Sequence, residues 1–210
     1  MLTKPNPAST TLYSATQELE SHAVRFIMAH KSIECAVIEL EFDDMPEEVL
    51  ELNPCQTMPT LFDRGMVLYD LSVIMEYLDE RFPFPPLLPI DPIEKAEKRL
   101  LIYRFTRAEG CWYELVGTIL NGDKKAADAA RKTLNGNLIE LIPLFAYQPY
   151  FKSDTMTLVD VCLAPVLWRL GILGIELGDK AKPILSYAAR LFDKEGFQEG
   201  LTFCEKDFNQ

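Results

Sequence analysis

The fold class that the sequence predicts is a two-domain protein, with an α/β domain followed by an all-helical domain. Short β-prone runs alternate with helical patterns in the first half, whereas every periodic segment after residue 92 indicates a helix. Between the halves, FPFPPLLPIDP (Phe82 to Pro92) holds five prolines in eleven residues. Proline fixes φ and removes an N–H donor, so this segment cannot be a helix or a central strand. We expect an α/β domain over 1–84, a proline-rich linker over 85–92 and an all-α domain over 93–210.

The first half alternates strands and helices in the order β-α-β-α-β-β-α, which is typical of a thioredoxin-like domain. A strand–helix–strand unit predicts that the first two strands are parallel. Asp63-Arg64-Gly65 joins the last two strands and is a hairpin signal. The expected strands are Thr10 to Ser14, Cys35 to Phe42, Pro59 to Phe62 and Met66 to Tyr69, and the expected helices are Leu19 to Ser32, Pro46 to Leu52 and Leu71 to Arg81.

The second half predicts a bundle of helices. Thr157-Leu158-Val159-Asp160 has the pattern of a capping box, in which Thr157 and Asp160 satisfy each other's backbone at a helix start. Pro165 interrupts the donors of that helix and should kink it. The expected helices are Ile93 to Leu120, Ala126 to Phe145, Leu158 to Leu173, Ala181 to Asp193 and Phe197 to Lys206.

The composition excludes several classes of function. The chain has 21 Lys and Arg against 32 Asp and Glu, a net charge of −11, with no basic run, which argues against direct binding of nucleic acid. No segment has the length of a membrane span or a signal peptide, so we expect a cytoplasmic protein with no membrane partner. Five scattered cysteines and two histidines predict neither a metal site nor a disulfide framework, but reduced and mostly buried thiols.

Several motifs resemble a known superfamily. TMPTL (Thr57 to Leu61), the proline linker and TLVD (Thr157 to Asp160) together resemble the glutathione transferases over essentially the whole chain. Three more specific segments are similar to the stringent starvation protein A family, the RNA polymerase-associated regulators of bacteria within that superfamily. These segments are EYLDERFPFPPLLP (Glu76 to Pro89), ADAARKTL (Ala127 to Leu134) and the run from Tyr150 to Leu177.

Because of the resemblance, the residues of this chain can be compared with those that a catalytically active glutathione transferase needs. The first position compared is Glu18. Glutathione transferases lower the pKa of the glutathione thiol with a hydroxyl or cysteine near the start of the first helix, where the helix dipole also helps. Glu18 aligns with that Ser or Cys, and its carboxylate would repel a thiolate and raise the thiol pKa. Tyr13, Ser14 and Thr16 lie nearby and stay open as substitutes.

The second test concerns the residues that hold glutathione. Met58-Pro59 precedes a strand where the fold usually has a cis-proline, which leaves the Met58 backbone facing a ligand groove. An acidic residue followed by serine usually holds the γ-glutamyl end, and here the pair aligns with Asp70-Leu71, which lacks the hydroxyl. Ser72 points about 100° away around a helix. We therefore expect no catalytic residue, no cofactor and no turnover of glutathione, with Glu18, Met58, Pro59, Asp70 and Leu71 as remnants of a groove. Weak binding of glutathione through Met58 and Asp70 stays open.

The resemblance also implies a function. It implies a homodimer that binds sigma-containing RNA polymerase holoenzyme and redirects promoter use under starvation or acid stress. The family's Pro-His-Pro docking surface maps to Pro83, Phe84 and Pro85, with Phe84 in place of histidine, and we expect both Phe84 and Leu87 to be exposed. Two alternatives stay open: a glutathione-dependent transferase or peroxidase, and a subunit that pairs with a paralogue, with a nucleotide alarmone at the interface.

Overall fold

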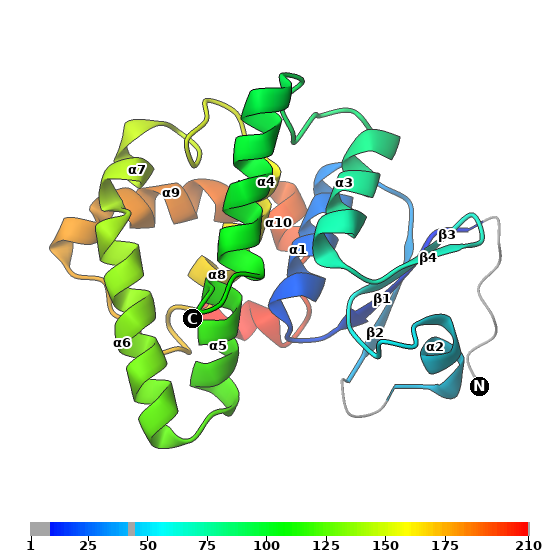
Figure 1. The fold of residues 1–210 in the computed structure, drawn as a ribbon, viewed down its shortest axis with the longest axis horizontal. Helices are drawn as coiled ribbons and strands as arrows, with labels where there is room; N and C mark the ends of the chain where they lie inside the picture. The colour runs from blue at the N-terminus through cyan, green and yellow to red at the C-terminus, as the bar shows by residue number, and fades with distance from the viewer. Residues whose placement is uncertain (1–8, 42–44, 210) are drawn as a thin grey trace. The chain divides into compact units, whose positions relative to one another are not determined.

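The computed structural model describes residues 9–41 and 45–209 of the 210-residue chain and divides it into two compact units (Figure 1). The first unit contains the described residues up to Pro85 together with the segment Glu195–Lys206. The second contains Pro86–Lys194 and the described residues from Asp207 onward. The segment 195–206, here called the strap, thus groups with the first unit although it follows the helical half in the sequence.

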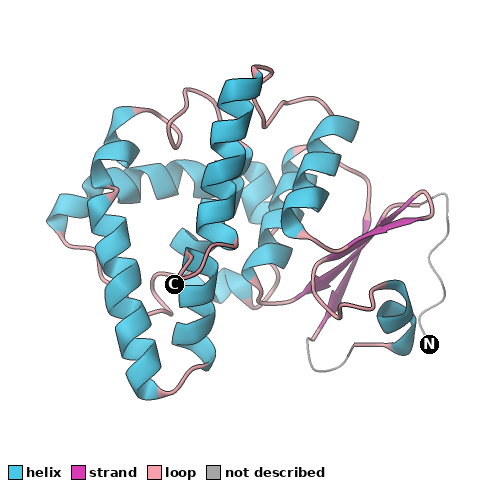
Figure 2. Cartoon of the chain, in the orientation of Figure 1, coloured by secondary structure: helices cyan, strands magenta, loops and turns pink. Residues whose placement is uncertain are grey.

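A four-stranded sheet forms the centre of the first unit. It contains β1 (Thr11–Ala15), β2 (Ala36–Leu40), β3 (Thr60–Asp63) and β4 (Met66–Leu68), in the order β2-β1-β3-β4. The register confirms the expected parallel pairing of β1 with β2 and the antiparallel hairpin of β3 with β4. Figure 2 shows these strands as the magenta part of the chain, bordered by helices.

Three helices complete the thioredoxin-like arrangement: α1 (Leu19–His30), α2 (Glu47–Leu52) and α3 (Leu71–Arg81). Helices α1 and α3 pack against each other. A separate apolar cluster lies around α2, where Val49 packs with Tyr13, Ala15 and Met58 from the strands and loop. The predicted fold class of this half is therefore confirmed.

The strap packs on α1 through two glycines. Its helix α10 (Glu195–Glu199) begins the segment, and a Cβ added to Gly196 would lie 2.5 Å from the backbone N of His30. A Cβ on Gly200 would lie 3.0 Å from the backbone N of Phe26. We expected one helix from Phe197 to Lys206, but α10 ends at Glu199 and only a short 3₁₀ turn, η2 (Glu205–Asn209), follows.

The second unit is the expected helical bundle, with two of the predicted helices each divided. The expected helix over 93–120 is interrupted after Arg107, because Gly110 adopts a φ of +68° that a helix does not permit. The expected helix over 126–145 restarts at α7, where proline lies in the first turn. The elements are α4 (Pro92–Thr106), α5 (Trp112–Asn121), α6 (Lys124–Glu140), α7 (Ile142–Tyr147), α8 (Leu158–Trp168), η1 (Asp179–Ala181) and α9 (Lys182–Phe192).

The start of α8 is organised by the buried carboxylate of Asp160. Both halves of the capping box formed by Thr157 and Asp160 are present. The carboxylate accepts hydrogen bonds from Thr157 N (2.7 Å), Phe151 N (2.8 Å) and the Tyr187 hydroxyl (2.6 Å). Burial raises the pKa of Asp160, and these hydrogen bonds oppose that rise. The motif thus has a structural role within the bundle.

The proline-rich segment is only partly exposed. Phe84 is 82% exposed, as expected, but Leu87 is 1% exposed, so the expectation of an exposed Leu87 is wrong. The Leu87 carbonyl accepts a hydrogen bond from Leu158 N at 2.9 Å, which ties this part of the segment to the start of α8. An apolar side chain beside a buried helix start gains more from burial than from solvent.

Candidate functional site

The predicted groove positions lie at one end of the sheet in the first unit. β1 ends at Ala15, and Glu18 follows as the N-cap of α1. Tyr13 of β1 pairs with Thr60 of β3, so the peptide Met58-Pro59 lies beside the end of β1. We call this region the groove end.

The beginning of α3 reaches the same place. Leu68 at the end of β4 pairs with Leu61 near the start of β3. The Thr57 hydroxyl also donates a hydrogen bond to the Tyr69 carbonyl at 3.3 Å. Asp70 and Leu71 therefore follow directly from a residue that is bonded to the Met58 loop.

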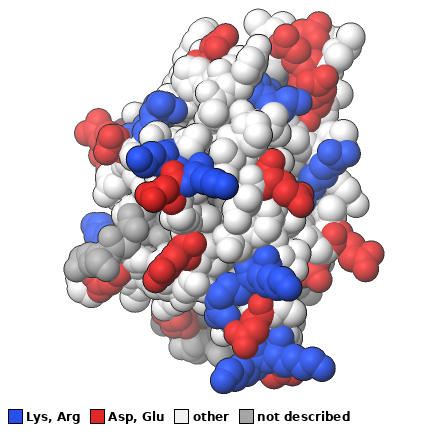
Figure 3. All heavy atoms as spheres, turned by 90° about the vertical axis from the view of Figure 1, so that its left-hand side faces the viewer, with Lys and Arg blue, Asp and Glu red and all other residues white. Residues whose placement is uncertain are grey.

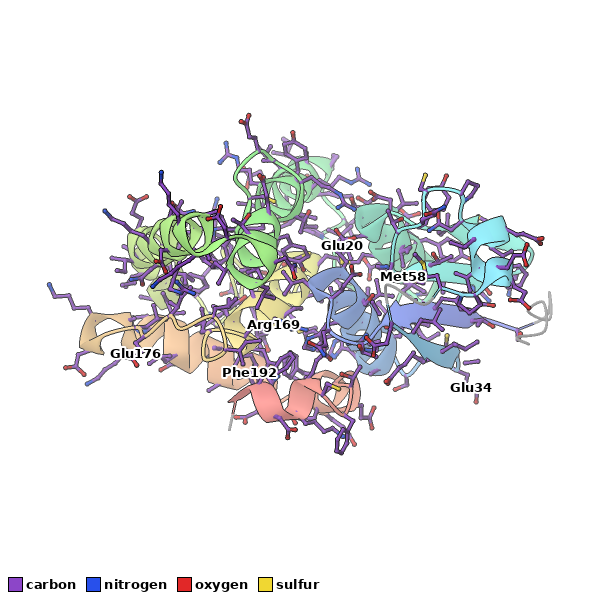
Figure 4. The ribbon with its side chains drawn as sticks, turned by 90° about the horizontal axis from the view of Figure 1, so that it is seen from below. Glu20, Glu34, Met58, Arg169, Glu176 and Phe192 are labelled. Atoms are coloured by element: carbon purple, nitrogen blue, oxygen red, sulfur yellow. The ribbon has the colours of Figure 1, made fainter. Side chains whose placement is uncertain are left out.

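Glu18 provides a carboxyl, not a hydroxyl or a thiol, at the start of α1. Its side chain makes no capping hydrogen bond, and its buried Oε2 has no hydrogen-bond partner among the described residues. Burial, assisted by the charge of Glu20 and opposed by Arg25, raises the pKa of Glu18 to about 7. Figure 4 labels Glu20, on the first turn of α1, and Met58. A carboxyl that is partly ionised at neutral pH does not favour a neighbouring thiolate.

Two of the three hydroxyl-bearing residues near Glu18 are bonded to other side chains. Ser14 is fully buried and accepts a hydrogen bond from Arg25. Thr16 donates to the Glu41 carboxylate at 3.0 Å. The third, Tyr13, is 1% exposed, and its ring packs with Met58 in the apolar cluster around α2.

Two backbone features of a glutathione groove are retained, and one side chain is not. The Met58-Pro59 bond is cis, as predicted, and neither the N–H nor the C=O of Met58 is hydrogen-bonded to another described residue. Asp70 caps α3 and accepts from Ser72 N (2.9 Å), Ser72 Oγ (2.8 Å) and Val73 N (3.1 Å). Leu71 is fully buried. The groove end therefore offers backbone groups but no hydroxyl at position 71.

The docking loop, defined as Pro83, Phe84 and Pro85, is held by a buried lysine. The Lys31 ammonium donates to the carbonyls of Phe82 (2.7 Å) and Pro85 (2.6 Å) and pairs with Asp79 at 2.8 Å. These three oxygens match the three N–H donors of an ammonium group. Phe84 thus projects from a segment that is fixed on both sides.

Sequence reasoning did not find Lys31. Its carbonyl acceptors lie 51 and 54 residues further along the chain, and backbone carbonyls carry no sequence signature. The one available signal is a lysine in the C-cap position of the amphipathic helix α1. Lysine is often found there for its effect on the helix dipole alone.

The groove end and the docking loop lie at opposite ends of the same two helices. Helix α1 begins after Glu18 and is capped by Lys31, and α3 begins after Asp70 and ends before Phe82. With a rise of about 1.5 Å per residue, α3 spans roughly 16 Å. The docking loop is therefore a separate surface from the groove.

The negative charge of the chain belongs to the first unit. Over the sequence, the first unit has six Lys and Arg against eighteen Asp and Glu, a net charge of −12. The second unit has fifteen against fourteen, a net charge of +1. Figure 3, which shows the side of α6 and α7, accordingly has both signs interspersed. An electrostatic attraction of basic partners would thus act on the first unit.

Other kinds of site find no support in the described residues. Among them, no group of three or more His, Cys, Asp and Glu is placed to hold a metal ion. Cys111 and Cys162 are buried, but Cys55 and Cys204 are exposed and Cys35 is half-buried, so the expectation of mostly buried thiols is wrong. Within 9–41 and 45–209, no helix combines the length and apolarity that crossing a bilayer requires.

Comparison with known proteins decides the family. The description "Glutathione S-transferase, N-terminal domain" matches residues 21–81, and "Glutathione S-transferase, C-terminal domain" matches 90–195. A stringent starvation protein A homolog of Coxiella burnetii is 41% identical over 201 residues, which is 95% of each chain. The chain belongs to the stringent starvation protein A family. A homolog of Haemophilus influenzae is 38% identical over 91% of this chain and 89% of its own.

Solved structures show that this stringent starvation protein A family member has the glutathione transferase fold. A glutathione S-transferase of Sinorhizobium meliloti matches with a TM-score of 0.81 and 22% identity over 97% of this chain and all of its own. A glutathione S-transferase of Rhodospirillum rubrum matches with a TM-score of 0.81 and 21% identity over 96% of this chain and all of its own. The predicted fold class is confirmed for both units.

A first prediction concerns the stability that Glu18 costs. The unfolded chain ionises this group near its ordinary pKa of 4.5, whereas the folded chain does so at about 7. As pH rises from 4.5 to 7 the unfolded state loses its proton first, so folding weakens by about 3 kcal/mol. We expect Glu18→Gln to raise the free energy of unfolding by that amount at pH 8. At pH 4 the substitution should change the free energy of unfolding little.

Urea unfolding at both pH values measures this effect. The control is Glu80→Gln, an exposed carboxylate on α3, which should change stability by less than about 0.5 kcal/mol at either pH. An equal gain from Glu18→Gln at pH 4 and pH 8 would show that titration of Glu18 is not its cause.

Proposed function

We propose that this chain is an RNA polymerase-associated transcription regulator, active in starvation and stress, that acts by protein contact and without glutathione transferase activity. The observation that carries the proposal is the exposed Phe84 on a loop that the buried Lys31 holds in place. An exposed aromatic ring on a fixed backbone loses little entropy on binding, which is the character of an interaction hot spot.

The groove end supports the absence of transferase activity. Glu18 is a carboxyl with a raised pKa, which is neutral or negative and never positive. The buried Leu71 has no hydroxyl. Both features oppose the ionisation and the placement of a glutathione thiol. The chain is then a glutathione transferase homologue whose function lies at another surface.

The charge distribution supports a polymerase-like partner over nucleic acid. A net charge of −12 on the first unit repels a phosphate backbone and attracts a protein surface rich in Lys and Arg. In the proposed function the chain therefore contacts the sigma-containing holoenzyme and does not bind promoter DNA itself.

The working form in this proposal is a homodimer in the cytoplasm. Each unit exposes apolar side chains that a second copy would cover, with Val73 51% exposed in the first unit and Tyr103 55% exposed in the second. Pairing with a paralogue, with a nucleotide alarmone at the interface, is an alternative form of the same assembly. Light scattering on the purified chain, alone and with the paralogue, distinguishes the two.

Capture of polymerase from starved cells with the tagged protein tests the function. We expect the core subunits and sigma to be recovered, and Phe84→Ala to weaken binding to purified holoenzyme roughly thirtyfold, the effect of losing a hot spot of about 2 kcal/mol. The matched control is Phe203→Ala, because Phe203 is 83% exposed and lies elsewhere in the first unit. No recovery of polymerase subunits would refute the proposal. Equal losses in both variants would remove the docking loop from the contact.

A glutathione-dependent transferase or peroxidase is the second candidate. The observation in its favour is the cis peptide before Pro59, where neither the N–H nor the C=O of Met58 is hydrogen-bonded to another described residue. Conjugation of glutathione to a standard electrophile is the assay. Turnover well above the uncatalysed rate would establish this candidate, whereas binding without turnover would leave the groove as a remnant.

A further inference from the structure

A hollow of about 280 Å³ in the first unit lies among α1, the strand β2 and the middle of the strap. Four apolar side chains contribute to its lining: Met28, Ile33, Val37 and Leu201. A recess of this size and character suits one long side chain with an alkyl stem, not a drug-sized ligand.

Two carboxylates give the hollow its charge. Glu39 of β2 and Glu199 of the strap both line it and are exposed, and neither forms an ion pair or side-chain hydrogen bond with another described residue. The cation of the lining, Arg25, is already bound to the Glu205 carboxylate at 2.6 Å and to the Gly200 carbonyl at 2.8 Å. The hollow therefore favours a ligand that carries positive charge at the end of an apolar stem.

The strand beside the hollow has a free edge. β2 is the last strand in the order β2-β1-β3-β4, and within the described chain no other strand pairs with its outer side (Figure 1). Ala36 N donates to the Thr10 carbonyl at 3.0 Å, and in a parallel ladder successive residues face alternate sides. The N–H and C=O groups of Val37 and Glu39 are thus directed to the outer edge. In Figure 4, Glu34 marks the start of this edge.

We propose that the outer edge of β2 and its hollow dock an extended, lysine- or arginine-rich segment of a partner protein. The segment adds a strand to β2 through the backbone of Val37 and Glu39. One of its cationic side chains enters the hollow, where its stem meets Val37 and its charge meets the two carboxylates.

The charge of the first unit favours this occupant over a second copy of the chain. Pairing two β2 edges would bring two units of −12 together and place Glu39 close to the partner's Glu39. The same charge excludes a nucleic acid strand. A basic extended segment is instead attracted by the negative charge of the first unit and by the Glu39 carboxylate.

This surface is distinct from the docking loop and does not rest on the proposed function. Val37 and Glu39 lie on β2, whereas the docking loop follows α3. Phe84→Ala should accordingly leave binding at β2 unchanged. Failure of the polymerase experiment would not affect the β2 proposal. Failure of the β2 experiment would likewise leave the proposed function untouched.

The probe is a fluorescein-labelled peptide of eight residues that alternates arginine with valine, titrated with the full chain by anisotropy. The double variant Glu39→Gln/Glu199→Gln should weaken its binding about tenfold. The matched control is Glu47→Gln/Glu80→Gln, which removes the same charge from two exposed positions outside the hollow and should change binding less than about twofold. Equal losses in the two double variants, or equal binding of a glutamine–valine peptide, would overturn the proposal.

The edge contact has its own readout. In amide NMR spectra of the full chain, the peptide should shift the signals of Val37 and Glu39 more than those of Ala36 and Ile38. Val37→Pro removes an outward N–H, which an edge strand tolerates, and should abolish the added strand, while Val37→Ala keeps it. Unshifted Val37 and Glu39 signals at saturation would contradict strand addition. Shifts that grow with protein concentration, without peptide, would assign the edge to a second copy and overturn the proposal.

Discussion

Lys31→Met is expected to lower the free energy of unfolding by about 3–5 kcal/mol and to release the docking loop. The variant removes the cation from Asp79, which is 7% exposed, and leaves the carbonyls of Phe82 and Pro85 without their shared donor. A buried carboxylate without its partner keeps the cost of desolvation and loses the attraction that offsets it. Urea unfolding measures the loss, and amide exchange at Phe82 and Phe84 measures the release.

A double variant separates folding from docking. Lys31→Met/Asp79→Leu removes both charges, so most of the lost stability should return, while the carbonyls of the loop stay without a tether. If Lys31 positions Phe84, this variant should still bind polymerase several-fold more weakly than the wild type. Polymerase affinity equal to the wild type would limit Lys31 to stability. Lys132→Met, at an exposed position on α6, is the control and should change stability by less than about 0.5 kcal/mol.

Arg25→Met is expected to cost a similar 3–5 kcal/mol, through the strap. The Arg25 guanidinium donates to the Glu205 carboxylate at 2.6 Å, to the Gly200 carbonyl at 2.8 Å and to the Ala15 carbonyl at 3.0 Å. Glu205 is fully buried, and its carboxylate also accepts from Thr202 N at 3.0 Å. Removal of the guanidinium therefore takes the cation away from the buried Glu205 carboxylate and removes one hydrogen-bond donor from each of the Gly200 and Ala15 carbonyls.

Denaturant unfolding and amide exchange in the strap measure this effect. Protection should fall at residues 196–202 before it falls in the sheet, because the strap loses its attachment while the ladder of β1 is intact. Arg104→Met, an exposed position on α4, serves as control. A loss below about 1 kcal/mol would mean that the glycine contacts with α1 hold the strap by themselves.

Local patterns in the sequence predict the fold and the positions of the residues at the groove end. Apolar periodicity and turn residues predict each strand and helix that the structure describes within residues 9–41 and 45–84 to within a few positions. Phe42, the predicted end of the second strand, lies outside the described residues. The resemblance identifies Met58-Pro59 and Asp70-Leu71. These features are short-range or belong to motifs. Their spacing in the sequence determines their spacing in space, since β3 and β4 form a hairpin.

The long-range contacts could not be predicted from such local patterns. Arg25 and Glu205 are 180 residues apart in the sequence. The sequence has 53 charged residues, and nothing in it indicates which of them form this ion pair. The sequence predicts a helix from Phe197 to Lys206, whereas in the structure Gly196 and Gly200 lie close against the backbone of α1. A pair of glycines four residues apart is the one signal that could have suggested close packing against another helix.

The strap also determines the order in which the molecule can be completed during synthesis. Residues 1–85 leave the ribosome first, yet Arg25 must wait for Glu205, near the other end of the chain, before its charge is neutralised. The first unit thus acquires all of its buried contacts only after the strap has been translated, and helices α4 to α9 can form before the strap is in place. A nascent chain that is stopped before residue 195 would leave the surface of α1 around Phe26 uncovered, which makes it a substrate for chaperones and proteases.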